Sequence, residues 1–436
     1  MIRQLRPKKY FLALITLIFA MFIGSLALVL VYSLPSNLIQ SNVKDSLTIY
    51  REEMEYFRWA PSYAGTQSDN WTDTLMLSIA SYSPPTQGVY AFKDIIEDSL
   101  LNPHYKSKDT DSPVVSLFQL FWGGETYRQE YSRYWHGYLI LLKPLLTILT
   151  MSDIRMCNMI IQLLLLFFLM ICLYTKGGYR LSLPFLFGII ALNPINSALS
   201  LQLSSVYYIT LLSCFVILKY NLYDSDKFWY FFFIIGICTS YFDLLSYPLV
   251  TLGFPLILYI LLKDEHLFSK MKQVITASIY WGMGYAGMWV GKWTVASLVT
   301  GNNIFINAYN QIKFRINGNV SWTAITIANA IKSNLCVFND IVFLLLYAIF
   351  LTIIGIIFPK KYTINPKKSI ILPLLFVGIY PFVWVSLLKN HSIIHFWCTH
   401  RIFSITILSL IYSAVYLFSP EILPNKEPND IKKDKQ

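Results

Sequence analysis

The residues best suited to chemistry in this chain of 436 residues lie in three short polar stretches between long apolar runs. The first stretch holds Asp69 and Asp73, which are four positions apart and share one face if the stretch is helical. Two such carboxylates suit proton removal from an acceptor hydroxyl, or the binding of a divalent cation. The structural alternative is a helix cap ahead of the apolar run that follows. We predict Asp73 as the catalytic carboxylate, with Asp69 as its partner.

The second stretch, residues 131–138, places a cation and an imidazole among aromatic rings. A guanidinium binds phosphate oxygens in a bidentate manner, and aromatic faces stack on sugar rings. An aromatic membrane belt would explain the tyrosines and tryptophan, but not the cation and imidazole together. The stretch predicts a surface for a sugar or a lipid phosphate, formed by Arg133, Tyr134, Trp135 and His136.

The third stretch, residues 389–401, holds His391 and His395 at a spacing that puts both on one helical face, followed by Arg401. This is a metal-ligand spacing, but no glutamate follows His391 as it would in the zinc-protease motif. An anion site for a phosphate head group fits these residues better. A short polar loop without function is the alternative.

Two further charges, Asp243 and Lys292, lie at the ends of predicted membrane spans. Ionisable groups at membrane depth are costly unless paired or hydrated, so each is a candidate site residue. A structural ion pair or a snorkelling side chain is the alternative for each.

The composition sets the class of protein. Apolar residues make up 55% of the chain and charged residues 14%, and the mean hydropathy is +0.50, which exclude an ordinary soluble enzyme. The formal charge of +11 lies mostly in short loops, so it indicates membrane topology rather than nucleic-acid binding. The apolar runs predict ten spans, at 10–32, 155–175, 181–194, 199–218, 228–241, 244–262, 273–294, 338–358, 369–388 and 402–419.

Basic residues ahead of the first run and in alternate loops predict that both termini are cytoplasmic. This requires 138–150 to be an interfacial helix, in keeping with Lys143 and Pro144 inside it. We therefore predict an all-α polytopic membrane protein with about ten transmembrane helices and a large first extracytoplasmic loop of membrane-surface helices. The predicted parts are the start and first span (1–32), the outer loop with the catalytic site (33–154), a six-span core (155–294), a second outer loop (295–337), three C-terminal spans (338–419) and a basic cytoplasmic tail (420–436).

Motifs of several other chemistries are absent from the sequence. It has no Walker A loop, no dinucleotide-binding glycine fingerprint, no Gly-x-Ser-x-Gly elbow and no Cys-x-x-Cys pair. The three polar stretches therefore remain the candidates for function.

In layout the chain resembles the GT-C class of membrane glycosyltransferases, which includes dolichyl-phosphate-mannose-protein mannosyltransferases and lipid A aminoarabinose transferases. Asp73 matches the acidic position in the first outer loop of that class. His136-Gly137-Tyr138-Leu139, sixty-three residues further on, stands where many members carry a His-Pro-Pro-Leu-like motif. The two prolines are missing here, and the spaced Asp69 and Asp73 replace adjacent acidic residues. The resemblance covers the pattern of roughly the first 270 residues.

The resemblance implies transfer of a sugar from a polyprenyl-phosphate donor to an extracytoplasmic glycan, lipid or protein, with inversion. It implies that Asp73 is the general base and that Asp243 orients a cation or binds sugar hydroxyls. The cations that would stabilise the departing phosphate are Arg133, His136, Lys292, His391, His395 and Arg401. A divalent cation at Asp69 and Asp73 is left open as a cofactor. Residue usage rich in Lys, Asn, Ile and Tyr favours a bacterial plasma membrane.

Two other functions remain open from the sequence. One is a transporter or flippase for a lipid-linked or small polar substrate, and the other is an accessory scaffold of an envelope-polysaccharide assembly. The predicted span interiors carry almost no charge, whereas a transporter is expected to place charges near the midplane. This favours a one-sided active site.

Overall fold

The computed structural model describes residues 7–83, 92–357 and 367–418. The predicted cytoplasmic tail and most of the basic connector after residue 357 lie outside the described residues. Within the described residues the fold is almost entirely helical, in agreement with the predicted class.

The first third of the chain forms one long helix followed by short elements. These are α1 (Pro7–Tyr32), α2 (Ser36–Asp45), α3 (Leu47–Glu53), the 3₁₀ turn η1 (Ala64–Thr66), α4 (Asn70–Ser81), α5 (Phe92–Leu101), β1 (His104–Ser107), α6 (Pro113–Trp122), β2 (Thr126–Gln129) and α7 (Leu139–Leu146).

The rest of the chain is helical throughout. Its elements are α8 (Met151–Ala191), α9 (Pro194–Leu199), α10 (Leu201–Lys219), η2 (Leu222–Asp224), α11 (Phe228–Phe242), α12 (Val250–Leu262), α13 (Leu267–Thr300), α14 (Ile304–Asn317), α15 (Ile327–Leu335), η3 (Cys336–Asn339), α16 (Ile341–Ile357), α17 (Lys368–Gly378), α18 (Tyr380–Leu387), α19 (Lys389–Ile394), α20 (Phe396–Thr399), η4 (His400–Phe403) and α21 (Ser404–Phe418).

The chain is a helical membrane protein. Among the described residues, five helices are long and apolar enough to cross a membrane, and a pair bent by 66° could supply a sixth. The five are Lys8–Tyr32, Met151–Ala191, Leu201–Lys219, Lys368–Leu387 and Phe396–Leu417. Ten such helices were predicted; the count is lower partly because α11 and α12, with 15 and 13 residues, fall short of the roughly 20 residues that a crossing needs.

The long helix α8 contains two of the predicted apolar runs and doubles back between them. Gly177 and Gly178 have non-helical backbone angles. Near the start of α8, Asn158 Nδ2 lies 3.4 Å from the carbonyl oxygen of Ala198, a residue that follows the end of this helix. Lys176, just before the two glycines, donates from Nζ to Asn221, which follows α10. The two halves of α8 are therefore antiparallel.

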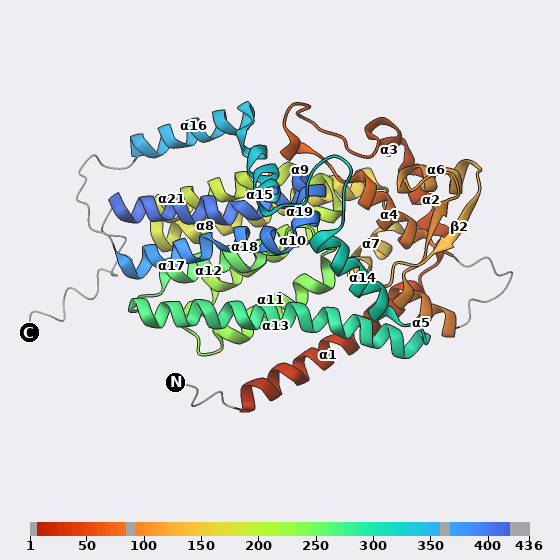
Figure 1. The fold of residues 1–436 in the computed structure, drawn as a ribbon, viewed down its shortest axis with the longest axis horizontal. Helices are drawn as coiled ribbons and strands as arrows, with labels where there is room; N and C mark the ends of the chain where they lie inside the picture. Colours follow the sequence, from red (N-terminus) through yellow and green to blue (C-terminus); the bar gives the residue numbers. More distant parts are fainter. Residues whose placement is uncertain (1–6, 84–91, 358–366, 419–436) are drawn as a thin grey trace, which may run out of the picture.

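The short elements α2 to α7 gather at one end of the helix bundle, away from the end where α1 begins and α21 finishes (Figure 1). The sequence predicted short helices here but not the antiparallel ribbon of β1 and β2, in which Tyr105 pairs with Arg128. Helix α7 has only eight residues, so the 138–150 segment contains no crossing helix. Its Lys143 is buried and donates to the Ala80 carbonyl at 2.8 Å.

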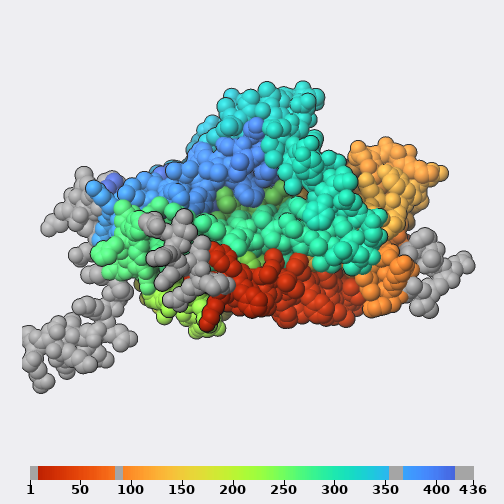
Figure 2. Space-filling model, turned by 60° about the horizontal axis from the view of Figure 1, so that its bottom comes forward, coloured from red at the N-terminus to blue at the C-terminus, as the bar shows by residue number. Residues whose placement is uncertain are grey.

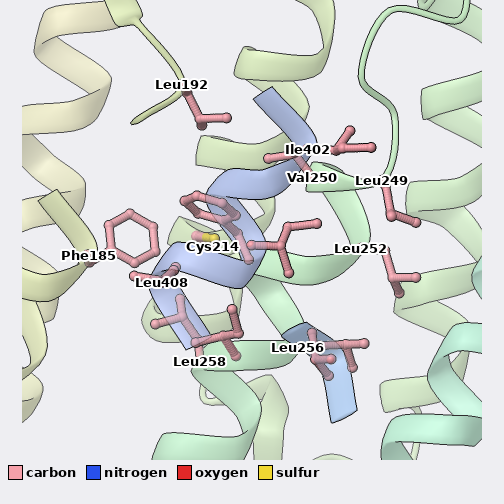
Figure 3. Close-up of a cluster of buried hydrophobic side chains, with 14 of the residues drawn as sticks. Phe185, Leu192, Cys214, Leu249, Val250, Leu252, Leu256, Leu258, Ile402 and Leu408 are labelled. Atoms are coloured by element: carbon pink, nitrogen blue, oxygen red, sulfur yellow. The ribbon is translucent and has the colours of Figure 1, made fainter. Parts of the chain in front are cut away.

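The main core lies between α8, α10, α12 and the C-terminal helices. Helix α12 is buried on all its faces in this core. Figure 3 shows part of it, with Phe185, Leu252 and Leu408 from three different helices among the buried apolar side chains. By contrast, α1 lies along one face of the molecule beside α13 (Figure 2). Few of its side chains are buried within the protein, as expected for a helix that faces lipid.

Two glycines bring α11 and α13 into close contact. A Cβ at Gly236 would lie 2.1 Å from the Trp281 carbonyl oxygen, and one at Gly284 would lie 2.2 Å from that of Phe233. Small residues at such crossings let helix backbones approach each other. This contact holds α13 in place, and α13 supplies one wall of the groove described below.

Candidate functional site

A polar cavity of about 260 Å³ lies where the cluster of short elements meets the helix bundle. It brings together residues from all three polar stretches of the sequence, with Tyr131 from the second. The side chains that line it are Tyr56, Asp69, Trp71, Thr72, Tyr131, Gln202, Leu244, Leu245, Ser246, Arg315, His391, His395, Trp397 and Cys398. A carboxylate, a guanidinium and aromatic faces thus line one enclosure.

Asp69 is the carboxylate that lines this cavity. It is the N-cap of α4 and accepts a hydrogen bond from the Thr72 backbone N–H at 3.0 Å. The side chain is only 5% exposed, and burial raises the pKa of Asp69 to about 6, against the lowering effect of the Thr72 bonds. A carboxylate with a pKa close to neutral pH is suited to general-base catalysis.

Asp73, one turn further along α4, does not line the cavity. Its carboxylate accepts hydrogen bonds from the Leu201 and Gln202 backbone N–H groups, both at 3.0 Å, and from Ser200 Oγ at 3.1 Å. It therefore caps the start of α10 and fixes Gln202 in the cavity wall. Burial raises the pKa of Asp73 to about 7. The catalytic role of Asp73 stays a prediction, and this geometry favours Asp69 instead.

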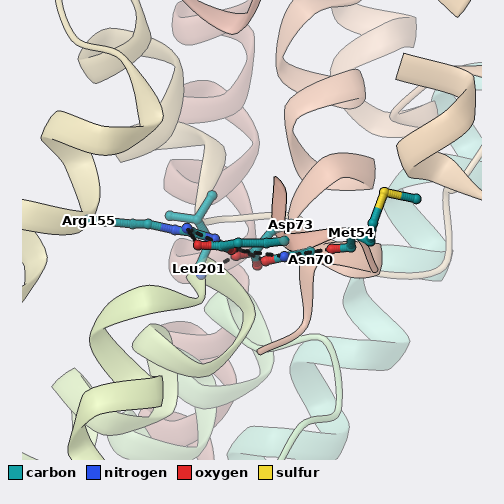
Figure 4. A network of polar contacts seen from close by, with 6 residues as sticks. Met54, Asn70, Asp73, Arg155 and Leu201 are labelled. Carbon is teal, nitrogen blue, oxygen red and sulfur yellow. Dashed lines mark hydrogen bonds and ion pairs between the residues drawn. The ribbon is translucent and has the colours of Figure 1, made fainter. Parts of the chain in front are cut away.

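A buried polar network holds the start of α4, the helix that carries Asp73 and is capped by Asp69 (Figure 4). Arg155 donates to both Glu53 carboxylate oxygens, at 2.8 and 3.0 Å, and to Asn70 Oδ1 at 3.0 Å. Asn70 in turn donates to the Met54 carbonyl at 2.7 Å. Because Asn70 directly follows Asp69, the network fixes the start of α4 and with it the direction of the Asp69 side chain.

We predict that Asp73→Ala lowers the free energy of unfolding by about 2 kcal/mol, because the start of α10 loses a buried cap. Asp73→Asn should lower it less, since its one amide oxygen can still accept from Gln202 and Ser200, while the bond from Leu201 is lost. Thermal unfolding of the purified protein in detergent measures the difference, with the exposed Asp45→Ala as control. Equal midpoints for Asp73→Ala and Asp45→Ala would contradict the capping role.

Arg315 on α14 is the cation of the cavity, and two histidines hold it. Its Nη1 donates to His395 Nε2 at 2.7 Å and to His391 Nδ1 at 3.1 Å. His391 Nε2 then donates to the Leu245 carbonyl at 2.9 Å, so both imidazoles are neutral. Burial, with the nearby His395 and Arg315, holds the pKa of His391 well below its ordinary value, and burial with Arg315 lowers that of His395 to about 3. The histidines thus orient a permanent cation.

An apolar groove of about 330 Å³ adjoins the polar cavity, and the two share Leu245 and Arg315. The groove is lined from α13 by Tyr285, Ala286, Trp289, Val290 and Trp293, from α14 by Ala308, Gln311, Ile312 and Arg315, from the end of α18 by Trp384, Leu387 and Leu388, and by Arg133, Tyr134 and Leu245. A molecule with an apolar chain and a polar head could occupy both spaces, with the junction at Arg315.

The second polar stretch of the sequence is divided by the structure. Arg133 and Tyr134 line the groove, and the guanidinium stacks on the Tyr131 ring at 4.3 Å. Trp135 and His136 line neither space. His136 is fully buried, with its ring nitrogens bonded to the Tyr138 hydroxyl and the Tyr131 carbonyl. It helps to shape the segment that carries Arg133.

Three other candidates from the sequence line neither the cavity nor the groove, and their side chains form hydrogen bonds within the fold. Lys292 donates to the Leu100 carbonyl and to Asn102 Oδ1. Arg401 donates to three backbone carbonyls, those of Gly65, Leu192 and Trp397. Asp243 accepts bonds from the Ser246 backbone and hydroxyl and so fixes the loop that carries Leu245 and Ser246 to the cavity.

A metal site at Asp69 and Asp73 finds little support in the donor arrangement. The part of the chain that the structure describes contains no group of three or more His, Cys, Asp or Glu side chains that could hold a metal ion. His391 and His395 each use a ring nitrogen to accept from Arg315, so these two nitrogens are not available as ligands of a metal ion.

Sequence reasoning missed Arg315, the residue common to both spaces. A signal was present, because Arg315 is a cation within the segment predicted to be a second outer loop, against the positive-inside bias. It also missed the groove wall of Tyr285, Trp289 and Trp293, whose i, i+4 spacing puts them on one face of α13.

Comparisons with protein-family models, with curated proteins and with solved structures give no significant match for this chain.

Proposed function

We propose that this protein is a membrane glycosyltransferase of the GT-C kind, which moves a sugar from a polyprenyl-phosphate donor to an extracytoplasmic acceptor. One observation carries the proposal: an apolar groove and a polar cavity with a buried carboxylate meet at a guanidinium, Arg315. The lipid chain would lie in the groove, its phosphate at Arg315, and the sugar in the cavity. Trp71, Tyr131 and Trp397 supply aromatic faces for the sugar ring there.

In the proposed reaction Asp69 is the general base. The acceptor hydroxyl attacks the anomeric carbon while its proton passes to the Asp69 carboxylate. The bond from that carbon to the phosphate oxygen breaks, and the electron pair leaves with the lipid phosphate. Arg315, preorganised by His391 and His395, stabilises the charge that grows there. Attack opposite the leaving group inverts the anomeric centre.

The proposal includes an orientation in the membrane. The elements α2 to α7 and the cavity would face the extracytoplasmic side of a bacterial plasma membrane, with both termini in the cytoplasm, as the basic loops indicate. Ten crossings would require both halves of α8 to cross, together with α11, α12 and α13. The turn at Gly177 and Gly178 supports the first of these requirements.

Gene deletion followed by mass spectrometry of polyprenyl-linked sugars and surface glycans tests the function. We expect one lipid-linked sugar to accumulate and one glycan decoration to disappear, with both restored by the intact gene. If the lipid-linked sugar accumulates only on the cytoplasmic leaflet, the protein is a flippase. Unchanged lipid-linked sugars and glycans would reject the transferase.

A further inference from the structure

Leu245 has a backbone conformation that leucine rarely adopts. Its φ is +69°, a region that most L-residues avoid because Cβ crowds the backbone. Asn102, Asn193 and Asn221 also have a positive φ, but asparagine tolerates this conformation, whereas a bulky leucine does not. Strained backbone of this kind persists only where the surrounding structure holds it, and it is concentrated at functional sites. The location of Leu245 agrees with this rule, because the residue lines both the polar cavity and the apolar groove.

The turn that carries Leu245 is held by its neighbours in the chain. Ser246 donates its backbone N–H to both carboxylate oxygens of Asp243, at 3.1 Å each, and its hydroxyl to the same carboxylate. The side chains of Leu244 and Leu245 are buried in the cavity wall. These contacts do not use the Leu245 carbonyl, so that oxygen can accept a hydrogen bond from another segment of the chain.

The segment that donates this bond is α19. His391 Nε2 lies 2.9 Å from the Leu245 carbonyl oxygen. A carbonyl can only accept, so Nε2 carries the proton, and the neutral ring keeps a lone pair on Nδ1. That lone pair accepts from Arg315 Nη1 at 3.1 Å, while His395 accepts from the same nitrogen at 2.7 Å. In the opposite tautomer, an N–H on Nδ1 would face the guanidinium and repel it.

We propose that Leu245 is a positioning residue: its strained backbone directs the carbonyl that fixes the tautomer of His391, and His391 in turn fixes Arg315. A relaxed backbone at residue 245 would point the carbonyl elsewhere and release the ring. The backbone of Leu245 acts here, and the side chain is secondary. The proposal deepens the proposed function, and it rests on that function only for the statement that Arg315 acts in sugar transfer.

Nitrogen-15 NMR of the purified full chain, labelled at histidine, measures the tautomer directly, because protonated and unprotonated ring nitrogens have well-separated shifts. The His391 signal is assigned by its loss in His391→Gln, and we expect its proton on Nε2. Leu245→Ile keeps the atoms of the side chain, but its branched Cβ disfavours a positive φ, so the Nε2–H form should fall below about half. Leu244→Ile makes the same change at the neighbouring residue, whose φ is not positive, and should leave the tautomer unchanged.

Leu245→Asn is the complementary variant, since asparagine tolerates a positive φ but is not apolar. It should keep the tautomer, and its turnover should stay within about threefold of the intact protein in membrane vesicles supplied with the accumulated lipid-linked sugar. Leu245→Ile should lower turnover about 10- to 100-fold, because the guanidinium is displaced. The reverse order, with Leu245→Ile active and Leu245→Asn inactive, would assign the role to the side chain and overturn the proposal.

A double variant separates positioning from a general loss of structure. If Leu245 acts through Arg315, Leu245→Ile should cause no further loss of turnover in a protein that already carries Arg315→Gln. A further loss of the same size as in the intact protein would overturn the proposal. So would a proton on Nδ1 of His391 in the intact protein, or a tautomer that Leu245→Ile leaves unchanged.

The NMR result does not depend on sugar transfer, so the two proposals can fail separately. If the tautomer responds as expected but gene deletion changes no glycan, the link from Leu245 to Arg315 stands and sugar transfer is rejected. If deletion removes a glycan decoration while Leu245→Ile leaves the tautomer unchanged, the positioning role fails and the proposed function stands.

Discussion

Replacing Asp69 by asparagine is expected to reduce sugar transfer at least about 100-fold, because a positioned general base contributes roughly 10² to 10⁴ to a rate. Asparagine keeps the size of the side chain and can still cap α4 through its oxygen, so the fold should be retained. The measurement is the amount of the affected surface glycan in deletion cells that express the variant at the level of the intact protein.

Asp73→Asn is the matched control, since it makes the same change one turn along the same helix. It should leave transfer within about threefold of the intact protein, because Asp73 caps α10 and does not line the cavity. If Asp73→Asn abolished transfer and Asp69→Asn did not, the roles assigned to the two carboxylates would be reversed, in line with the resemblance to GT-C enzymes.

The pKa of Asp69 adds a pH dependence to the same prediction. Burial raises it to about 6, and a base acts only when it is deprotonated. Transfer by membranes of intact cells should therefore rise between pH 5 and pH 7 with a midpoint near 6, and the residual activity of Asp69→Asn should lack this rise. A flat profile for the intact protein would contradict Asp69 as the titrating base.

Arg315→Gln is the second change with a large expected effect. In the proposed reaction it removes the cation next to the leaving phosphate, and the loss of one such preorganised group lowers rates roughly 10²- to 10³-fold. We expect turnover to fall by this factor, with donor binding weakened as well. The readout is the rate of glycan labelling in membrane vesicles supplied with the accumulated lipid-linked sugar.

Two further variants separate charge from geometry at this position. Arg315→Lys should recover only part of the activity, because an ammonium keeps the charge but cannot donate from a planar fork to both histidines and the phosphate. Lys313→Gln, which removes an exposed cation two residues away, should have no effect. Full activity in Arg315→Gln would show that the groove and the cavity are not used together.

The class of fold could be predicted from composition and apolar runs, because a bilayer imposes long apolar helices whatever the tertiary packing. The number of crossing helices could not. Whether a run such as 244–262 becomes a full span depends on where its helix begins, and Val250–Leu262 starts six residues later. The loop that replaces its first turn is held by Asp243 and Ser246, a local contact with no sequence periodicity.

The candidate site could be predicted by region but not by role. The sequence identified Asp69 and Asp73 as a pair, yet the partner that binds Asp73 is the start of α10, about 130 positions away. It predicted an anion site formed by Arg401 with His391 and His395, but in the structure the two imidazoles contact Arg315, and Arg401 donates to backbone carbonyls instead. Packing between segments that are distant in the sequence decides which charged groups face a cavity and which form hydrogen bonds with buried backbone groups.

Photo-crosslinking from inside the groove tests most directly the proposal that one lipid-linked sugar occupies both the groove and the cavity. A benzophenone amino acid at Ile312, which lines the groove, would be activated in cells carrying Asp69→Asn, so that untransferred donor remains bound. The same label at Tyr309, an exposed residue of α14 outside the groove, is the control. We predict a polyprenyl-phosphate sugar crosslinked at 312 and absent at 309. Identical bulk phospholipids at both positions, with no sugar-linked lipid, would contradict the account.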